Sequence, residues 1–330
     1  MQTRILGRTG RPVSVIGLGT WQLGADWGEV DPADARAVLE TSLEAGVTFY
    51  DTADVYGDGR SERFLGEFLA AHPDAGITIA TKLGRRAPQE PANYTLDNFR
   101  SWTSRSRRNL GVDMLDLVQL HCPPTAVYET DTVFDALDTL VDEGVIAAYG
   151  VSVEETAQAL TAIERPAVAT VQIILNAFRL KPLDEVLPAA EQAGVGIIAR
   201  VPLASGLLTA KYTESTTFAD NDHRTYNRGG AAFDVGENVL RRRLRDRGPG
   251  RARVRRARAR RHHGGAGRPR LDRPASRGEH GDPGSQEPRA GARQRRGGRA
   301  ARPRRRLPAR HPRDLRPPLP GRRALPLVVG

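Results

Sequence analysis

The chain has one cysteine, Cys122, among its 330 residues, which excludes an internal disulfide bond. It lacks any run of about 20 apolar residues that could span a membrane, and its N-terminus lacks the apolar stretch of a secretory signal peptide. No cysteines and histidines occur at the spacing of metal ligands, and there is no P-loop for binding phosphate. These absences predict a cytoplasmic protein with no membrane segment and no metal site.

Lysine is absent from residues 241–330, although this segment contains 30 arginines and only 6 acidic residues, a net charge of +24. Since the whole chain has a net charge of +11, the first 240 residues carry −13. The isoelectric point of about 10.5 is therefore a property of the tail alone. A basic segment can bind nucleic acid, but basic tails that do so usually mix lysine with arginine.

The first 237 residues alternate between short β runs and longer amphipathic segments. A β-hairpin is predicted around Gly7 and Gly10, and seven β runs follow it, at residues 15–20, 47–52, 77–82, 115–120, 147–152, 170–175 and 196–201. Several of these runs are apolar on both faces, which is typical of a buried parallel sheet. Such an alternation favours either a (β/α)₈ barrel or a doubly wound sheet. The GLGT sequence at 17–20 lacks the third glycine of the dinucleotide-binding turn found in doubly wound folds.

Four residues that can carry chemistry stand at or just beyond the ends of successive β runs. Asp51 ends the second run and Tyr56 follows in the loop, Lys82 ends the third run, and His121 follows the fourth. In a barrel, the carboxyl ends of all strands open on one face, where active sites lie. Each residue alone has a simpler explanation, as a turn former, a packing residue or a solvated charge. The prediction of a site therefore depends on the four occurring together.

A tyrosine beside a lysine has a definite chemical use. A free tyrosine has a pKa of about 10 and donates a proton poorly near neutrality. A lysine ammonium about 4 Å away favours the phenolate by roughly 4 kcal/mol at an effective dielectric constant of about 20, which is about three pKa units. We therefore expect Lys82 to bring the Tyr56 pKa towards neutrality, Asp51 to keep Lys82 charged, and His121 to orient a substrate oxygen. Such a set would stabilise the alkoxide that forms when hydride reaches a carbonyl carbon.

The sequence around these residues resembles that of the aldo-keto reductases, in particular the bacterial branch related to the potassium-channel β subunit. The motifs, in order along the chain, are GLGTWQLG, FYDTADVYG, IATKLG, LVQLHCP, YGVS, VQIILN and VPLASGLLTAKYT. The resemblance covers residues 3 to about 237. It implies an α/β fold, a (β/α)₈ TIM barrel with an N-terminal β-hairpin. It also implies an NAD(P)H-dependent oxidoreductase that reduces aldehydes and ketones to alcohols.

The resemblance further implies a catalytic set of Asp51, Tyr56, Lys82 and His121, with Tyr56 as the general acid. The implied cofactor is NADPH, and the residues implied to bind it are Thr20, Trp21, Asp51, Ser152, Gln172, Arg200, Pro202, Leu203, Ala204, Ser205 and Lys211. Arg200 stands where relatives often carry an aromatic residue that stacks on the nicotinamide ring. The expected partner is a small carbonyl substrate, and the sequence does not specify an oligomeric state.

The regular pattern stops near residue 237, so we divide the chain into an incomplete reductase barrel, 1–237, and an Arg/Gly/Pro-rich tail, 238–330. When the bases that encode residues 238–246 (NVLRRRLRD) are shifted by one nucleotide, they can encode TFSGVDYET. GC-rich codons for Gly, Ala, Val and Asp shifted in this way give arginine but rarely lysine. We therefore expect the tail to be an out-of-frame translation and disordered. The barrel would then be truncated after its seventh strand, with two unpaired edges and doubtful activity.

Two other functions are compatible with the sequence. The barrel could bind a nicotinamide cofactor as a regulatory or redox-sensing protein, or the basic tail could bind nucleic acid. The complete set of Asp51, Tyr56, Lys82 and His121 favours the enzyme over the sensor. The absence of lysine from the tail argues against the nucleic-acid hypothesis.

Overall fold

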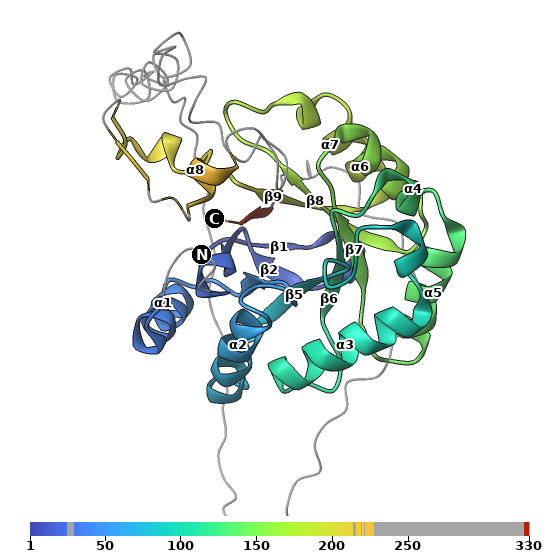
Figure 1. The fold of residues 1–330 in the computed structure, drawn as a ribbon, viewed down its shortest axis with the longest axis horizontal. Coiled ribbons are helices and arrows are strands. Elements are labelled where there is room, and N and C mark those ends of the chain that lie inside the picture. The colour runs from blue at the N-terminus through green and yellow to red at the C-terminus, as the bar shows by residue number, and fades with distance from the viewer. Residues whose placement is uncertain (25–29, 214–215, 219, 221, 228–326, 330) are drawn as a thin grey trace, which may run out of the picture. The chain divides into compact units, whose positions relative to one another are not determined.

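The computed structural model describes residues 1–24, 30–213, 216–218, 220, 222–227 and 327–329 (Figure 1). Its centre is a closed barrel of parallel strands in the order β10, β3, β4, β5, β6, β7, β8 and β9. Seven of these strands coincide with the seven predicted β runs. They are β3 (Ile16–Gly19), β4 (Phe49–Asp51), β5 (Thr78–Leu83), β6 (Leu117–His121), β7 (Tyr149–Ser152), β8 (Val168–Ile174) and β9 (Gly196–Arg200). The barrel is confirmed, and the doubly wound alternative is excluded.

Burial of the strands on both sides explains why their sequences are apolar on both faces. All residues of β5 and β8 are buried, and β6 is buried up to His121 at its end. Strand residues alternate between the barrel interior and the layer beneath the helices. One interior cluster lies where the hairpin meets the barrel, and it consists of Leu6, Val13, Phe49, Ala80, Leu117 and Ile198.

Helices connect the strands around the outside of the barrel (Figure 1). They are α1 (Pro32–Glu44), α2 (Arg60–Ala71), α3 (Leu96–Leu110), α5 (Asp131–Asp142), α6 (Thr156–Ile163) and α7 (Val186–Ala193). Asp31 caps α1, because its carboxylate accepts a hydrogen bond from the Ala33 N–H at 2.7 Å. Thr95 caps α3 in the same way, accepting from the Asn98 N–H at 3.3 Å.

The predicted N-terminal hairpin is also confirmed, with β1 (Thr3–Ile5) antiparallel to β2 (Pro12–Ser14) and the short 3-10 helix η1 (Gly7–Thr9) between them. Gly7 has a φ of 47°, and a Cβ atom there would lie 2.1 Å from the Gly196 nitrogen, so only glycine fits. Arg8 Nη1 donates hydrogen bonds to the carbonyl oxygens of Arg165 and Val168 at 3.1 and 2.9 Å. The hairpin is thus fixed at the amino ends of β8 and β9, at the opposite end of the barrel from the candidate residues.

The barrel is closed by β10 (Leu327–Val329), and this differs from the truncated barrel with two free edges that we expected. Val328 of β10 is opposite Ile16 of β3 on one side and opposite Ala199 of β9 on the other, both in parallel register. The free edges of β3 and β9 would expose unpaired N–H and C=O groups, which β10 can pair. The sequence of β10, Leu-Val-Val, is apolar and suits a strand of a buried parallel sheet. Residues 327–329 therefore form a strand, although we expected the whole tail to be disordered. The rest of the tail, residues 238–326 and 330, lies outside the described residues.

Short helices that the sequence analysis did not predict occupy several loops. They are η2 (Trp21–Gly24), η3 (Pro91–Asn93), α4 (Thr125–Tyr128), η4 (Lys181–Leu183), η5 (Leu207–Thr209) and α8 (His223–Tyr226). Each is too short to show a helical repeat of apolar residues, so periodicity could not reveal it. Five of them, η2, η3, α4, η4 and η5, follow strands directly and so belong to the end of the barrel that carries the candidate site.

Candidate active site

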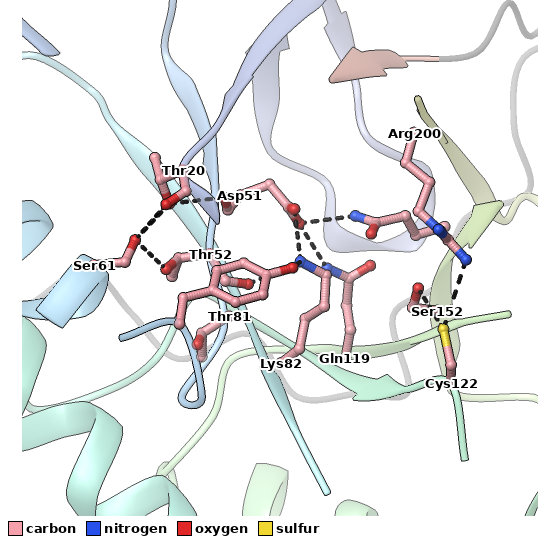
Figure 2. Close-up of polar contacts among 12 residues, drawn as sticks. Thr20, Asp51, Thr52, Ser61, Thr81, Lys82, Gln119, Cys122, Ser152 and Arg200 are labelled. Carbon is pink, nitrogen blue, oxygen red and sulfur yellow. Dashed lines mark hydrogen bonds and ion pairs between the residues drawn. The ribbon is translucent and has the colours of Figure 1, made fainter. Parts of the chain in front are cut away.

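The carboxyl ends of β4 and β5 bring Asp51 and Lys82 together inside the barrel (Figure 2). Both residues are buried, and Lys82 Nζ lies 2.6 Å from Asp51 Oδ2. Lys82 Nζ also donates to the Thr52 carbonyl oxygen at 2.9 Å. Burial alone would lower the Lys82 pKa, but the Asp51 carboxylate and Tyr56 outweigh it, so the pKa is raised. Lys82 is therefore a fixed ammonium group.

Two amide side chains complete the surroundings of Asp51. Gln172 Nε2 on β8 donates to Asp51 Oδ1 at 2.8 Å, and Gln119 Nε2 on β6 donates to the same oxygen at 3.2 Å (Figure 2). Both amides are buried. A buried carboxylate with a cation on one oxygen and two N–H donors on the other has its charge compensated. The site thus has an anchored, oriented ion pair at its base.

Tyr56 lies partly buried beside this pair, in the loop between β4 and α2. Lys82 Nζ donates to Tyr56 Oη at 3.5 Å. The Tyr56 ring meets the His121 ring edge to face, with centroids 5.8 Å apart, and stacks on Trp21 at 6.1 Å. The structure therefore brings together all four residues of the predicted catalytic set, and it places Trp21 against them.

The lowered Tyr56 pKa that we expected is not found in the structure. Burial raises the pKa of the Tyr56 hydroxyl, and the Lys82 ammonium, which lowers it, is itself opposed by the charge of Asp51. The Lys82 ammonium lies close to the expected distance, but burial and the paired Asp51 carboxylate outweigh its effect on the Tyr56 pKa. Tyr56 is therefore a neutral hydroxyl at neutral pH, the form that can donate a proton.

His121 ends β6 and presents a neutral ring to the same space. Its Nδ1 atom is buried and has no hydrogen-bond partner among the described residues. Burial, followed by the charges of Arg85, Lys82 and Arg200, holds the pKa of His121 well below its usual value. Arg85 Nε also donates to the His121 carbonyl oxygen at 3.0 Å, which fixes the strand end. A neutral imidazole here can accept or donate one hydrogen bond to a ligand oxygen.

A buried group of hydroxyls ties the neighbouring segments together. Thr20 Oγ1, after β3, donates to the Asp51 carbonyl oxygen at 3.0 Å. The Ser61 hydroxyl, in the first turn of α2, lies 2.8 Å from the hydroxyls of both Thr20 and Thr52 (Figure 2). These contacts hold the ends of β3 and β4 against α2. Thr20 is thus placed by the structure next to Asp51, and its side chain has a structural role in the ligand-free protein.

A second polar group lies across the ends of β6, β7 and β9. Ser152 is buried, and its hydroxyl lies 3.4 Å from Cys122 Sγ. Arg200 Nη2 lies 3.7 Å from the same sulfur and donates to the Val153 carbonyl oxygen at 3.2 Å (Figure 2). Two of the predicted cofactor residues, Ser152 and Arg200, are therefore neighbours, and Arg200 adds a positive charge to this side of the site.

The remaining predicted cofactor residues form the loop after β9. In this loop, Val201, Ala204 and Ser205 have positive φ values of 54°, 50° and 54°. Pro202 and Leu203 lie between them, and Asn176 Nδ2 fixes the loop to β8 through the Val201 carbonyl oxygen at 3.1 Å. The Ala204 and Gly206 N–H groups donate to the carbonyl oxygens of Val201 and Leu203 at 3.0 and 3.1 Å, so the loop is held by its own turns. Lys211 is exposed beyond η5.

Three functional neighbours were missed by the sequence analysis: Gln119, Ser61 and Asp54. A signal for Gln119 was present, because it stands two residues before His121 on one strand and so shares its face. Ser61 and Asp54 had no such signal, because both lie outside the strands and an isolated polar residue near a loop is usually solvated. In the structure both are fully buried.

Within the described residues, no group of His, Cys, Asp and Glu side chains is arranged to hold a metal ion. Among the helices of the described ranges, none has the length and apolar character needed to cross a membrane.

The sequence model of the aldo/keto reductase family matches residues 15–247. An uncharacterised oxidoreductase of Mycobacterium bovis is 35% identical over 61% of this chain, which spans 61% of that protein's length. A probable voltage-gated potassium channel β subunit of Oryza sativa is 31% identical over 67% of this chain and 70% of its own length. A crystal structure of an aldo/keto reductase from Klebsiella pneumoniae in complex with NADP and acetate is 25% identical, with a TM-score of 0.54, over 63% of this chain and 71% of that one. The chain therefore belongs to the aldo/keto reductase family of oxidoreductases.

Proposed function

We propose that the protein is an NADPH-dependent reductase that converts a small aldehyde or ketone to the alcohol, with Tyr56 as the general acid. The observation that carries the proposal is the group of Tyr56, Lys82 and His121 at the carboxyl ends of the strands, with Lys82 Nζ 2.6 Å from Asp51 and 3.5 Å from Tyr56 Oη. Family membership and a relative crystallised with NADP support a nicotinamide cofactor.

The residues divide the chemistry as follows. Bound NADPH supplies the hydride that reaches the carbonyl carbon. The Tyr56 hydroxyl donates its proton to the carbonyl oxygen, and the Lys82 ammonium stabilises the phenolate that remains. Asp51 keeps Lys82 charged and directed at Tyr56. The neutral His121 ring hydrogen-bonds the substrate oxygen and so aligns the carbonyl group.

The polar groups around the site fit a dinucleotide. Ser152 and Gln172 supply a hydroxyl and an amide that can hold a carboxamide. The cations of Arg200 and Lys211 favour an anionic ligand such as the diphosphate. The buried His121 Nδ1 atom lacks a partner among the described residues.

Replacement of Tyr56 tests the proposal. Tyr56→Phe removes only the proton donor, so we expect kcat to fall by about 10²-fold or more, while the dissociation constant of NADPH stays within about twofold. NADPH oxidation with a panel of aldehydes and the quenching of tryptophan fluorescence measure the two quantities. A variant that kept most of its kcat would contradict the role of Tyr56. Absence of any carbonyl-dependent NADPH oxidation by the wild-type chain would contradict the activity itself.

The out-of-frame origin of the tail, residues 238–330, is kept as a proposal that rests on its composition. Sequencing the gene across codons 236–240 decides it. An additional base at this place would support the proposal. A gene without an additional base, in which residues 238–330 are encoded in the same frame as residues 1–237, would contradict it.

A further inference from the structure

We propose that Asp54 is a positioning residue whose neutral carboxyl group allows the Tyr56 loop, residues 52–59, to close beside Lys82, and whose ionisation loosens that loop. The inference rests on the proposed function only for the role of Tyr56, because the loop and the burial of Asp54 are features of the structure itself. Opening of the loop would then be coupled to the release of one proton.

The side chain of Asp54 is completely buried, with 0% of its surface exposed. No side chain among the described residues donates a hydrogen bond to either of its carboxyl oxygens. The backbone N–H of Asp54 donates to the Lys82 carbonyl oxygen at 3.1 Å, which fixes the residue against the end of β5. A buried carboxylate without a partner costs several kcal/mol, and the group remains neutral instead.

Two arginines lie close to Asp54, but their guanidinium groups bind other atoms. Arg105 of α3 donates to the Asp54 carbonyl oxygen at 3.0 Å, and to the carbonyl oxygen and carboxylate of Asp58 at 2.8 Å each. Arg86, after β5, donates to the Asp54 carbonyl oxygen at 3.3 Å and to the Asp58 carboxylate at 2.8 Å. The two cations therefore hold the loop on both sides of Tyr56 and leave the Asp54 carboxyl group without an ion pair.

The groups that face Asp54 come from three elements and from its own loop. Glu62 of α2 is fully buried, and its oxygens accept hydrogen bonds from Thr81 Oγ1 at 2.7 Å and Asn109 Nδ2 at 2.8 Å. Burial and then the charge of Glu62 raise the pKa of Asp54 to about 7, against the smaller opposing effects of Arg86, Arg105 and the Val55 N–H. In an open loop the carboxyl group regains water, and its pKa returns to about 4.

This difference fixes the sign of the pH dependence. The closed loop binds a proton on Asp54 between about pH 4 and pH 7, whereas the open loop does not, so raising the pH favours opening. For one proton the equilibrium constant for opening rises up to about tenfold per pH unit in this range and is constant above it. The Tyr56 loop is therefore held most firmly on the acidic side of neutrality.

Hydrogen–deuterium exchange of the full 330-residue chain tests the inference without requiring activity. We expect the protection of the peptide covering residues 52–60, corrected for intrinsic amide exchange rates, to fall by about 50-fold between pH 5 and pH 7 and to level off above pH 7. In Asp54→Asn, which keeps the shape of the side chain, protection should be independent of pH. The smaller side chain in Asp54→Ser should give the same flat profile.

Arg100→Gln is the matched control, because Arg100 lies on α3 like Arg105 but pairs with Glu143 on the surface. It should keep the wild-type slope. A wild-type loop whose protection does not change with pH, or a slope that persists in Asp54→Asn, would overturn the inference. If the slope is found and no carbonyl is reduced, the proposed function fails while the positioning role of Asp54 stands.

Discussion

Asp51 and Asp54 are buried carboxyl groups separated in the sequence only by Thr52 and Ala53, yet the fold treats them in opposite ways. Asp51 has the Lys82 ammonium 2.6 Å from one oxygen and two glutamine amides on the other. Asp54 has no side-chain donor among the described residues and faces the buried Glu62. Burial by itself therefore does not decide whether a carboxyl group is charged. The partners supplied by neighbouring strands and helices decide it.

The largest effect should follow from removing the cation of the first pair. Lys82→Met leaves the Asp51 charge buried without its partner, so we expect the free energy of unfolding to fall by about 3–5 kcal/mol and reductase activity to be lost. Denaturant unfolding at pH 7 measures the first quantity. The double variant Asp51→Asn/Lys82→Met should recover part of the stability, because no buried charge remains. Equal stability of the single and double variants would show that Asp51 and Lys82 do not depend on each other.

A second effect, of opposite sign, is expected at Asp54. Its pKa in the folded protein, about 7, is above the unfolded value, so the native state keeps a proton that the unfolded chain releases. The stabilising contribution of this group is present below about pH 4 and is lost as the pH rises to about 7, by up to about 4 kcal/mol in total. Asp54→Asn should therefore equal the wild type near pH 4 and be more stable at pH 8. Unfolding curves at both pH values test this, and a difference that does not change with pH would contradict it.

The smallest effect should come from one of the amides around Asp51. Gln119→Met removes a donor at 3.2 Å but also removes a buried amide oxygen that has no partner among the described residues. The two changes oppose each other, and Gln172 still donates to the same carboxylate oxygen at 2.8 Å. We expect a loss of about 1 kcal/mol, measured by denaturant unfolding. A loss as large as that of Lys82→Met would mean that the amides, and not the ammonium, compensate the charge of Asp51.

The strand ends show how far the sequence could predict the site. The apolar runs located β4, β5 and β6, and their ends located Asp51, Lys82 and His121, because parallel strands in a barrel all open on one face. The direction of the Tyr56 pKa was not predictable in this way. It depends on the burial of the hydroxyl and on the charge of Asp51, which are known only once the strands are side by side.

The strand at the end of the chain, in contrast, was not predictable from the sequence. The run at Leu327–Val329 was the one aliphatic segment in a basic tail, and nothing in its neighbours indicated a strand. In the structure it pairs with β3 and β9 and closes the barrel. Strand pairing between residues far apart in the chain depends on the unpaired edges that the rest of the fold offers, and local sequence does not contain that information.

The sequence by itself determined the alternation of strands and helices, the hairpin and the residues at the strand ends. These features follow from local conformational preference and from the spacing of apolar residues, which a single stretch of chain contains. Only the tertiary structure decided which carboxyl group is paired, which is neutral, and how Tyr56 is held. Those properties depend on distances between side chains of different elements, because charge, burial and hydrogen bonding act through space.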